Sequence, residues 1–301
     1  MSKYVQTNFH DALSTRAILV MLLAVAIAAF SGGLMKILVE TMEPPLVSFF
    51  RFTGYFFLLF PLAVYRFGWG LLTPYRTDVQ VIRGFVIVMG NTAFMYGVKH
   101  LDYANSIAIL YVYPFLMISL SVWILQESVS RATWLGVLGG FLGVILVLRP
   151  DVVKMNFNGL FILFTGLMVA IQMLLSRKLG VATSPIIVTV WGAFIASVIS
   201  GLFATIFWRF PNPTEILIIS GLCVATALSQ TLMIIAMSWA SADRIAPFTY
   251  FEIPAATFIG FVLFGTLPDL LSWSGMLLII LSGVLVRLVP IWLKSSKGKK
   301  I

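Results

Sequence analysis

The sequence predicts an all-α integral membrane protein with about ten transmembrane helices, arranged as two inverted repeats of five helices each. Three observations lead to this fold class. The composition is too apolar for a soluble protein, the apolar residues gather in stretches long enough to span a bilayer, and the two halves of the chain match at a nearly constant offset.

The composition excludes an ordinary water-soluble fold. Of the 301 residues, 60% are hydrophobic and 10% are charged, whereas roughly 25% of the residues of a soluble domain are charged. A soluble fold could not hide so much apolar surface, because part of its surface must always face water. A bilayer removes this conflict, since each helical crossing needs about 20 apolar residues.

The apolar residues form ten stretches that predict helices. They cover residues 17–39, 45–65, 81–98, 103–125, 132–149, 157–176, 184–207, 214–237, 245–265 and 271–293. Runs of about 18 to 25 residues suit transmembrane helices. A transmembrane barrel would show blocks of about ten residues with alternating hydrophobicity, and this sequence has no such pattern.

The two halves of the chain match each other from end to end. An offset of 140 or 141 residues aligns Ala29 with Ala170, Pro44 with Pro185, Pro114 with Pro254, Gly143 with Gly283, and Pro150 with Pro290. Two units with an odd number of helices must insert in opposite orientations, which is the inverted-repeat design of many secondary transporters. We therefore predict a first repeat at 17–150, a second repeat at 157–290 and a basic tail at 291–301.

The basic residues predict the orientation of the chain. An even number of crossings puts both termini on one side, and that side holds Lys3, Arg16, Arg66, Arg76, Arg83, Arg131, Arg177, Lys178, Arg244, Lys294, Lys297, Lys299 and Lys300. The opposite loops hold only Lys99, Arg149, Lys154 and Arg209. Because cytoplasmic loops of inner-membrane proteins are enriched in lysine and arginine, both termini are predicted to lie in the bacterial cytoplasm.

This distribution also explains the net charge of +9 without nucleic acid. The basic residues set the orientation in the membrane, so no nucleic-acid partner is expected. The tail at 291–301 is predicted to lie on anionic lipid headgroups, with a plain solubilising tail as the alternative.

Two charged residues inside the predicted spans are candidates for function. A charge at the centre of a span costs roughly 2.5–3.5 kcal/mol, so it is usually buried in protein, paired or in contact with water. Glu252 is the only carboxylate deep inside a span, and Arg51 lies well inside the second span. Glu252 is expected to exchange a proton in each transport cycle or to bind a cationic substrate group; the alternative is that it only joins two helices. Lys36, near a helix end, is expected to reach the headgroups.

Polar and aromatic residues add further candidates. Asn91 and Gln230 occupy corresponding positions of the two repeats, which favours both lining the repeat axis. Tyr111 and Tyr113 lie just before Pro114, and transporters use such helix breaks at their binding sites. With Glu252, these four residues are predicted to face one water-filled cleft.

One deep tryptophan completes the predicted site. Trp191 could stack on a ring-bearing substrate, although plain packing is the alternative. The predicted substrate-binding residues are therefore Arg51, Asn91, Tyr111, Tyr113, Trp191, Gln230 and Glu252.

Motifs for other functions are missing from the sequence. It has one cysteine, Cys223, and two histidines, His10 and His100, so we expect no intramolecular disulfide, no metal site and no membrane-embedded metalloenzyme. No phosphate-binding loop for ATP is present, and we expect no cofactor. A non-transporting scaffold or sensor would usually carry a soluble output domain, and the predicted loops are too short for one. A secondary transporter of a small-molecule substrate remains.

Glycines in the fifth predicted span have the spacing of a helix-packing motif. Gly136 and Gly140, like Gly139 and Gly143, lie four residues apart, which lets a neighbouring helix approach closely. Packing within the chain and a homodimer both fit this spacing.

Several motifs carry a resemblance to a known family. They are Phe49–Arg51, Arg83, Tyr103–Asn105, Glu127–Gly136 with the glycines that follow it, and Leu148–Pro150. With Lys36 they make the chain similar, over about 17–290, to the EamA branch of the drug/metabolite transporter superfamily. The similarity is greatest to the subgroup that contains riboflavin and S-adenosylmethionine transporters.

The resemblance implies a fold and a function. It implies two EamA repeats of five helices, with the third, fourth, eighth and ninth helices around a central cavity. It also implies transport of a ring-containing metabolite such as riboflavin, with export of amino acids or other metabolites as the alternative.

Overall fold

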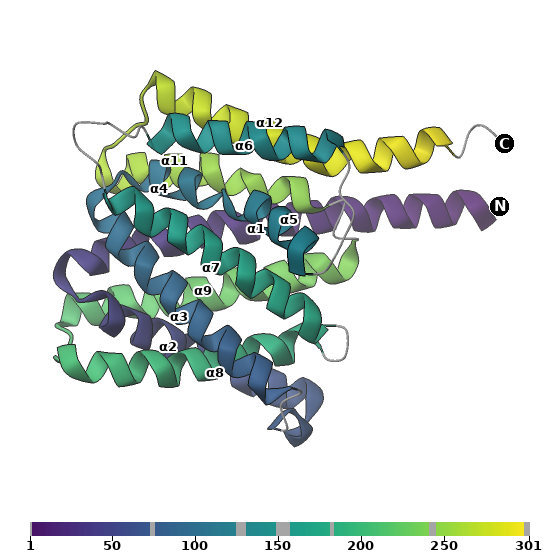
Figure 1. The fold of residues 1–301 in the computed structure, drawn as a ribbon. Helices are drawn as coiled ribbons and strands as arrows, with labels where there is room; N and C mark the ends of the chain where they lie inside the picture. Colours follow the sequence, from purple (N-terminus) through teal and green to yellow (C-terminus); the bar gives the residue numbers. More distant parts are fainter. Residues whose placement is uncertain are drawn as a thin grey trace.

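The computed structural model describes residues 2–72, 76–124, 131–148, 157–180, 184–240 and 245–297. Its elements are α1 (Ser2–Thr41), α2 (Pro44–Phe67), η1 (Trp69–Leu72), α3 (Thr77–His100), α4 (Tyr103–Leu110), α5 (Tyr113–Ile124), α6 (Arg131–Leu148), α7 (Phe157–Gly180), α8 (Pro185–Ala204), η2 (Thr205–Phe207), α9 (Pro213–Trp239), η3 (Ala246–Phe251), α11 (Glu252–Phe264) and α12 (Leu270–Lys297). These residues include no strand, and helices occupy each predicted stretch (Figure 1), so the all-α prediction is confirmed.

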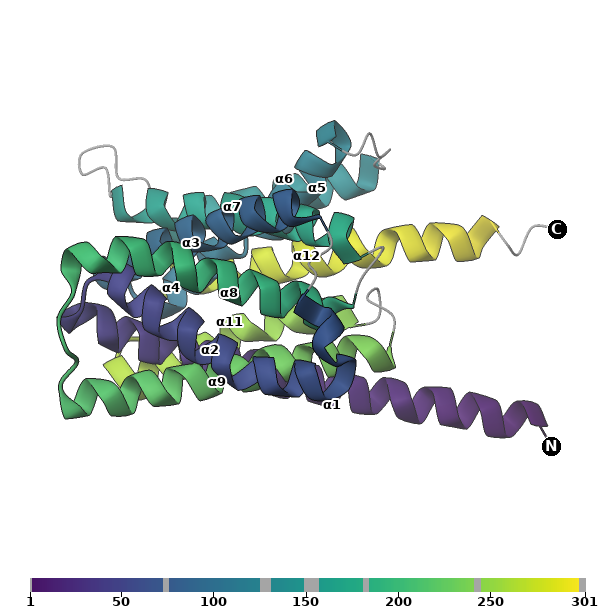
Figure 2. The same cartoon turned by 90° about the horizontal axis from the view of Figure 1, so that it is seen from below.

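The helices run roughly side by side along one axis (Figures 1 and 2). Within the described residues, eight helical segments are long and apolar enough to cross a membrane. Two shorter apolar helices, Thr133–Leu148 and Leu270–Val286, accompany them. About ten crossings result, and both termini lie at the same end of the bundle, as an even number of crossings requires (Figure 1).

The first and last helices extend beyond the predicted spans. Helix α1 already begins at Ser2, and α12 continues to Lys297, so the predicted tail is helical at 291–297. Residues 298–301 lie outside the described part of the chain. So do 125–130 and 149–150, which hold Glu127 and the Arg149–Pro150 end of the predicted first repeat.

Two crossings are interrupted at corresponding places in the halves. The fourth crossing consists of α4 and α5, separated by a turn at Tyr111 and Val112. The ninth consists of the 3₁₀ segment η3 and the α-helix α11. Pro114 and Pro254 lie in the first turns of α5 and α11, where a residue without an N–H breaks no helical hydrogen bond. The predicted proline breaks therefore lie beside real interruptions.

The packing of the helices follows the repeat. Each helix of the first half packs on helices of the second, and exchanging helices for their counterparts reproduces the main pairs. The contact of α1 with α9 corresponds to that of α7 with α3, and α2 with α9 corresponds to α8 with α3. The contact of α1 with α11 corresponds to that of α7 with α5, and the pairs α2 with α8 and α6 with α12 map onto themselves. This pattern is that of two repeats related by a two-fold axis.

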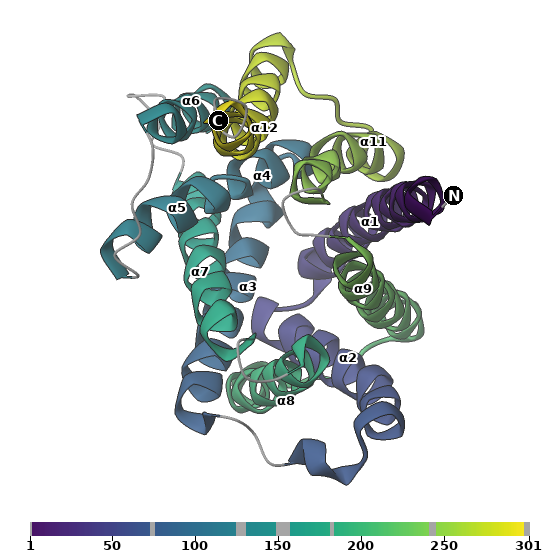
Figure 3. The same ribbon diagram turned by 90° about the vertical axis from the view of Figure 1, so that its right-hand side faces the viewer.

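The helices α6 and α12 pair closely at one side of the bundle (Figure 3). A Cβ atom added at Gly143 would lie 2.8 Å from the carbonyl oxygen of Gly275, and one added at Gly139 would lie 2.5 Å from Oγ of Ser282. The glycine spacing thus serves packing within the chain. A homodimer could use these glycines only by displacing α12.

The orientation of the bundle is a prediction that labelling can test. Residues 40–44 and 267–270 are expected in the periplasm, and 66–80 and 294–301 in the cytoplasm, because the basic loop residues cluster on the second side. We expect a cysteine at position 297, with Cys223 replaced by serine, to be protected from a membrane-impermeant thiol reagent in intact spheroplasts. A cysteine at position 43, where the native glutamate is exposed, serves as the accessible control. Labelling at 297 without lysis would contradict this orientation.

Candidate functional site

A central cavity of about 350 Å³ lies between the two halves of the protein. Side chains of α1, α2, α3, α4 and α5 line it from the first half, and side chains of α7, α8, α9 and α11 line it from the second. Its volume falls in the range of about 300–1,000 Å³ that is typical of sites for small molecules. The repeat therefore places a chamber of suitable size where both halves meet.

Most of the predicted site residues meet in this cavity. Its wall includes Arg51 from α2, Asn91 from α3, Tyr113 from α5, Gln230 from α9 and Glu252 from α11. They come from five helices and both halves, so only the tertiary fold brings them together.

The other two predicted residues lie elsewhere. Tyr111 is 1% exposed and sits behind the wall, where it contacts Glu252. Trp191 is not among the cavity-lining residues of the described chain. Its ring packs edge-on against Phe194, with 5.6 Å between the centroids, and Phe194 is exposed on the outside of the bundle. In this conformation Trp191 therefore packs against a neighbouring side chain, which was the alternative interpretation of this residue.

Arg51 is held by neutral groups. Its Nη1 donates to Oδ1 of Asn91 at 2.5 Å and to the sulfur of Met35 at 3.4 Å. Asn91 in turn donates from Nδ2 to Oγ of Ser48 at 2.9 Å. Among the described residues no carboxylate lies within ion-pair distance of Arg51. The guanidinium is oriented by its neighbours, but its charge is not neutralised by them.

Glu252 lies at the interruption of the ninth crossing. Its Oε2 accepts a hydrogen bond from the hydroxyl of Tyr111 at 2.9 Å. The same hydroxyl also contacts the carbonyl oxygen of Thr249 in η3. A tyrosine hydroxyl has one proton, so with an ionised Glu252 it can donate to only one of these two acceptors at a time. Tyr111 therefore connects the carboxyl group of Glu252 to the backbone of η3, at the interruption of the ninth crossing.

Arg83 is a cavity residue that the sequence analysis missed. The sequence analysis placed it at the start of the third span, 81–98, and counted it with the basic residues of the cytoplasmic side, but α3 begins at Thr77 and Arg83 is only 6% exposed. Its Nε donates to Oγ of Ser176 at 2.7 Å and its Nη1 to the carbonyl oxygen of Val188 at 3.0 Å. A rise of about 1.5 Å per residue puts it about 9 Å inside the helix. Arg83 could have been predicted as a cavity residue only if the start of its helix had been placed correctly, at Thr77.

The position of Arg83 depends on the absence of a side chain at residue 192. A Cβ atom at Gly192 would lie 2.2 Å from Nη1 of Arg83, so Gly192→Ala must push the flexible guanidinium aside. We expect this variant to fold normally, because only the end of a side chain has to move, but to lose transport activity several-fold. Gly70→Ala is the control, since a Cβ there meets nothing within 4 Å. Wild-type transport by Gly192→Ala would show that Arg83 need not stay in place.

Lys36 does not extend to the headgroups as expected. Its Nζ donates to the carbonyl oxygens of Val98 and Leu101, the first at 2.9 Å, and lies 5.3 Å from the ring centroid of Phe264. These carbonyls belong to the end of α3, where the last turn leaves acceptors without partners and the helix dipole favours a cation. The expectation was wrong because the ammonium group finds its acceptors inside the protein, at the end of α3.

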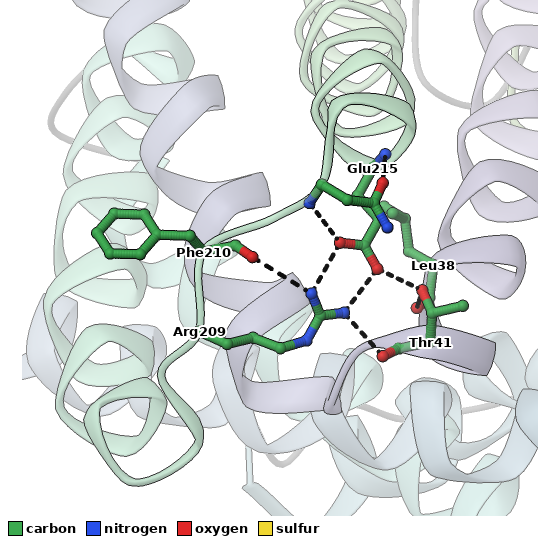
Figure 4. A network of polar contacts seen from close by, with 6 residues as sticks. Leu38, Thr41, Arg209, Phe210 and Glu215 are labelled. Carbon is green, nitrogen blue, oxygen red and sulfur yellow. Dashed lines mark hydrogen bonds and ion pairs between the residues drawn. The ribbon is translucent and has the colours of Figure 1, made fainter.

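The end of the bundle opposite the termini is joined by a polar clasp of Thr41, Arg209, Asn212 and Glu215 (Figure 4). Arg209 donates from Nη1 and Nη2 to the two carboxylate oxygens of Glu215, at 2.8 and 2.6 Å, and from Nη2 to the carbonyl oxygen of Thr41 at 2.8 Å. Asn212 caps α9 and exchanges two hydrogen bonds of 2.9 Å with Glu215. Since Thr41 ends α1, the clasp connects the first half to the second.

Loss of the clasp is expected to open this end of the protein. Arg209→Gln should lower the melting temperature of the purified protein by a few degrees, because Glu215 is 5% exposed and would lose a bidentate partner. Arg76→Gln, which removes an ion pair with 57% and 62% exposed side chains, should have almost no effect. Equal melting temperatures for both variants would contradict a stabilising role of the clasp.

Comparisons with known proteins agree with the architecture. The sequence pattern of the EamA-like transporter family matches residues 15–149 and 157–288. One solved crystal structure superposes on this chain with a TM-score of 0.66 at 18% identity. The match covers 93% of this chain and 99% of the chain in that structure. At this identity the likeness concerns the fold.

Curated relatives carry names of transporters. An S-adenosylmethionine uptake transporter of Rickettsia bellii is 26% identical over 273 residues, which covers 90% of this chain and 94% of the relative. A riboflavin transporter of Vibrio cholerae is 29% identical over 224 residues, which covers 73% of this chain and 72% of the relative. An uncharacterised transporter of Helicobacter pylori is 28% identical over 280 residues and covers 88% of this chain and 92% of its own.

Proposed function

Because the chain belongs to the EamA-like transporter family, we propose that it is a secondary transporter that carries a small ring-containing metabolite across the bacterial inner membrane by alternating access. The observation that carries this proposal is the central cavity, which both halves line. Inverted repeats have two arrangements of similar energy, so rocking one half against the other exposes a site on their axis to either side in turn.

The clasp is the contact that this motion has to break. It holds α1 to the loop before α9 at the end opposite the termini. Opening that end separates Thr41 from Arg209, while the carboxylate of Glu215 keeps its partners within the α8–α9 segment. The clasp therefore acts as a gate that favours the state closed at this end.

Glu252 is proposed as the coupling residue. When the carboxyl group is protonated, it can donate to Tyr111, and the Tyr111 hydroxyl is free to donate to Thr249. When it is ionised, it accepts the hydrogen bond of the Tyr111 hydroxyl, and the carbonyl oxygen of Thr249 loses that donor. Because η3 and α11 meet at this residue, a change in proton occupancy alters the backbone interruption of the ninth crossing.

The substrate is proposed to contain a ring, because Tyr113, Phe52 and Phe94 contribute aromatic surface to the cavity. Riboflavin and S-adenosylmethionine, the substrates in the names of two relatives, are the first candidates. Export of amino acids or other metabolites is the second candidate function, and the charged groups of the cavity wall suit the carboxylate and ammonium of an amino acid.

Transport by the purified protein tests this function. The full chain is reconstituted into proteoliposomes, and uptake of labelled riboflavin, S-adenosylmethionine and aromatic amino acids is measured with and without a pH gradient. We expect saturable uptake of at least one of these compounds and counterflow in preloaded vesicles. Uptake no greater than in empty liposomes for the whole panel would refute the proposal.

A further inference from the structure

The cavity contains more positive than negative charge. Its charged side chains in the described part of the chain are those of Arg51, Arg83 and Glu252. Both guanidinium groups are held by neutral acceptors, and the two ion pairs found among the described residues lie elsewhere, at Arg76–Asp78 and Arg209–Glu215. Charges at membrane depth are costly and are usually paired. The missing partner of these cations is therefore expected to enter from outside the chain.

The unoccupied donors of α2 show where this partner would bind. Nη1 of Arg51 is used by Asn91 and Met35, whereas Nη2 and Nε have no acceptor among the described residues. One turn later on the same helix face, Tyr55 is 6% exposed and its hydroxyl also has no partner among them. Buried donors without partners cost about 1–3 kcal/mol each, so native proteins rarely leave them unused.

The geometry of these donors selects a planar oxyanion. Nε and Nη2 form one edge of the guanidinium, and such an edge presents two parallel N–H groups that match the two oxygens of a carboxylate. Asn91 fixes the other side of the group through Nη1 and so keeps this edge in place. Arg83 lines the same cavity as Arg51 and Tyr55 and adds positive charge to its wall.

We propose that the Nε–Nη2 edge of Arg51, together with the hydroxyl of Tyr55, binds a carboxylate group of the transported substrate. This inference rests on the proposed function and narrows its substrate class to ring-containing metabolites with a carboxylate. Within that class, a cationic substrate group faces Glu252, whose Oε1 has no hydrogen-bond partner among the described residues. An amino-acid group, with its carboxylate and ammonium, meets both requirements.

Pairs of compounds that differ only in the carboxylate test this inference. The probes are S-adenosylmethionine with decarboxylated S-adenosylmethionine, and tryptophan with tryptamine. Binding to the purified full chain is measured as the concentration-dependent rise in melting temperature. We expect the carboxylate-bearing member of at least one pair to bind at least about tenfold more tightly than its partner, which corresponds to about 1.4 kcal/mol.

Substitutions of Arg51 and Tyr55 test whether these two residues cause the preference for the carboxylate-bearing compound. Arg51→Gln should abolish the preference for the carboxylate, Arg51→Lys should keep part of it, and Tyr55→Phe should weaken it. Arg76→Gln, which removes an exposed cation outside the cavity, should leave the preference unchanged. If Arg51→Gln does not fold, Arg51→Lys still tests the guanidinium edge and Tyr55→Phe still tests the hydroxyl beside it.

The outcomes separate this inference from the proposed function. Equal binding of both members of each pair to the wild type, or an unchanged preference in Arg51→Lys and Tyr55→Phe, would overturn the carboxylate site. Binding and uptake of riboflavin, which has no carboxylate, without binding of the four probes would overturn it too, yet leave the transport function intact. Failure of all five compounds to bind would count against both.

Discussion

Replacement of Glu252 by glutamine is expected to give a folded protein that no longer accumulates substrate in response to a pH gradient. Glutamine keeps the shape of the side chain and can still accept a hydrogen bond from Tyr111, whose hydroxyl lies 2.9 Å from Oε2. It cannot gain or lose a proton. Any step that depends on the proton occupancy of residue 252 is therefore lost, while binding and exchange are retained.

The size of this effect follows from the driving force. One pH unit contributes about 1.4 kcal/mol per proton, so a wild-type protein that moves one proton per substrate accumulates it about tenfold. The variant should show no accumulation but should exchange labelled for unlabelled substrate. Glu252→Asp, which keeps a titratable group, is the control and should retain part of the accumulation. Wild-type accumulation by Glu252→Gln would rule out this coupling mechanism.

A valine at position 143 is expected to have the largest effect on folding. A Cβ atom there would lie 2.8 Å from the carbonyl oxygen of Gly275 and 3.0 Å from the backbone nitrogen of Ile279. Backbone atoms of α12 cannot turn aside as a side chain does, so α6 and α12 must separate along their length. Overpacking typically costs about 1–3 kcal/mol, and a backbone clash on a helix pair costs more.

Size-exclusion chromatography and thermal unfolding of the purified variant measure this effect. We expect Gly143→Val to yield little monodisperse protein and a clearly lower melting temperature. Leu142→Val is the matched control, because Leu142 is 57% exposed on the neighbouring helix face. Because a Cβ atom added at Gly275 would lie 2.7 Å from the carbonyl oxygen of Gly143, Gly275→Val should reproduce the defect. A stable Gly143→Val protein would mean that the two helices do not need this close approach.

The fold could be predicted from the sequence because bilayer crossing leaves few choices. Ten apolar stretches fix the helices, and the constant offset between prolines and glycines fixes the repeat. Five predicted site residues also meet in the cavity, since repeat symmetry and helix breaks both point to the axis. Hydrophobicity and symmetry are properties of the sequence itself.

The remaining features depend on distances that no sequence pattern records. Arg83 was placed at the cytoplasmic end of the third span because hydropathy cannot show that α3 starts six residues earlier, at Thr77. Lys36 was expected at the headgroups because the free carbonyls at the end of α3 appear only once that helix is placed beside α1. Trp191 was expected in the cavity because depth in the membrane does not say which way a helix face turns.

Thiol labelling of a single cysteine in the cavity tests the central claim, alternating access to one chamber, most directly. Gln230, which lines the cavity from α9, is replaced by cysteine after Cys223 has been changed to serine. The rate of reaction with a membrane-impermeant reagent is then measured in right-side-out and inverted vesicles, with and without the transported compound. The account predicts labelling from both sides and slower labelling when substrate is bound. A cysteine that reacts from only one side under all conditions, or that substrate does not protect, would contradict it.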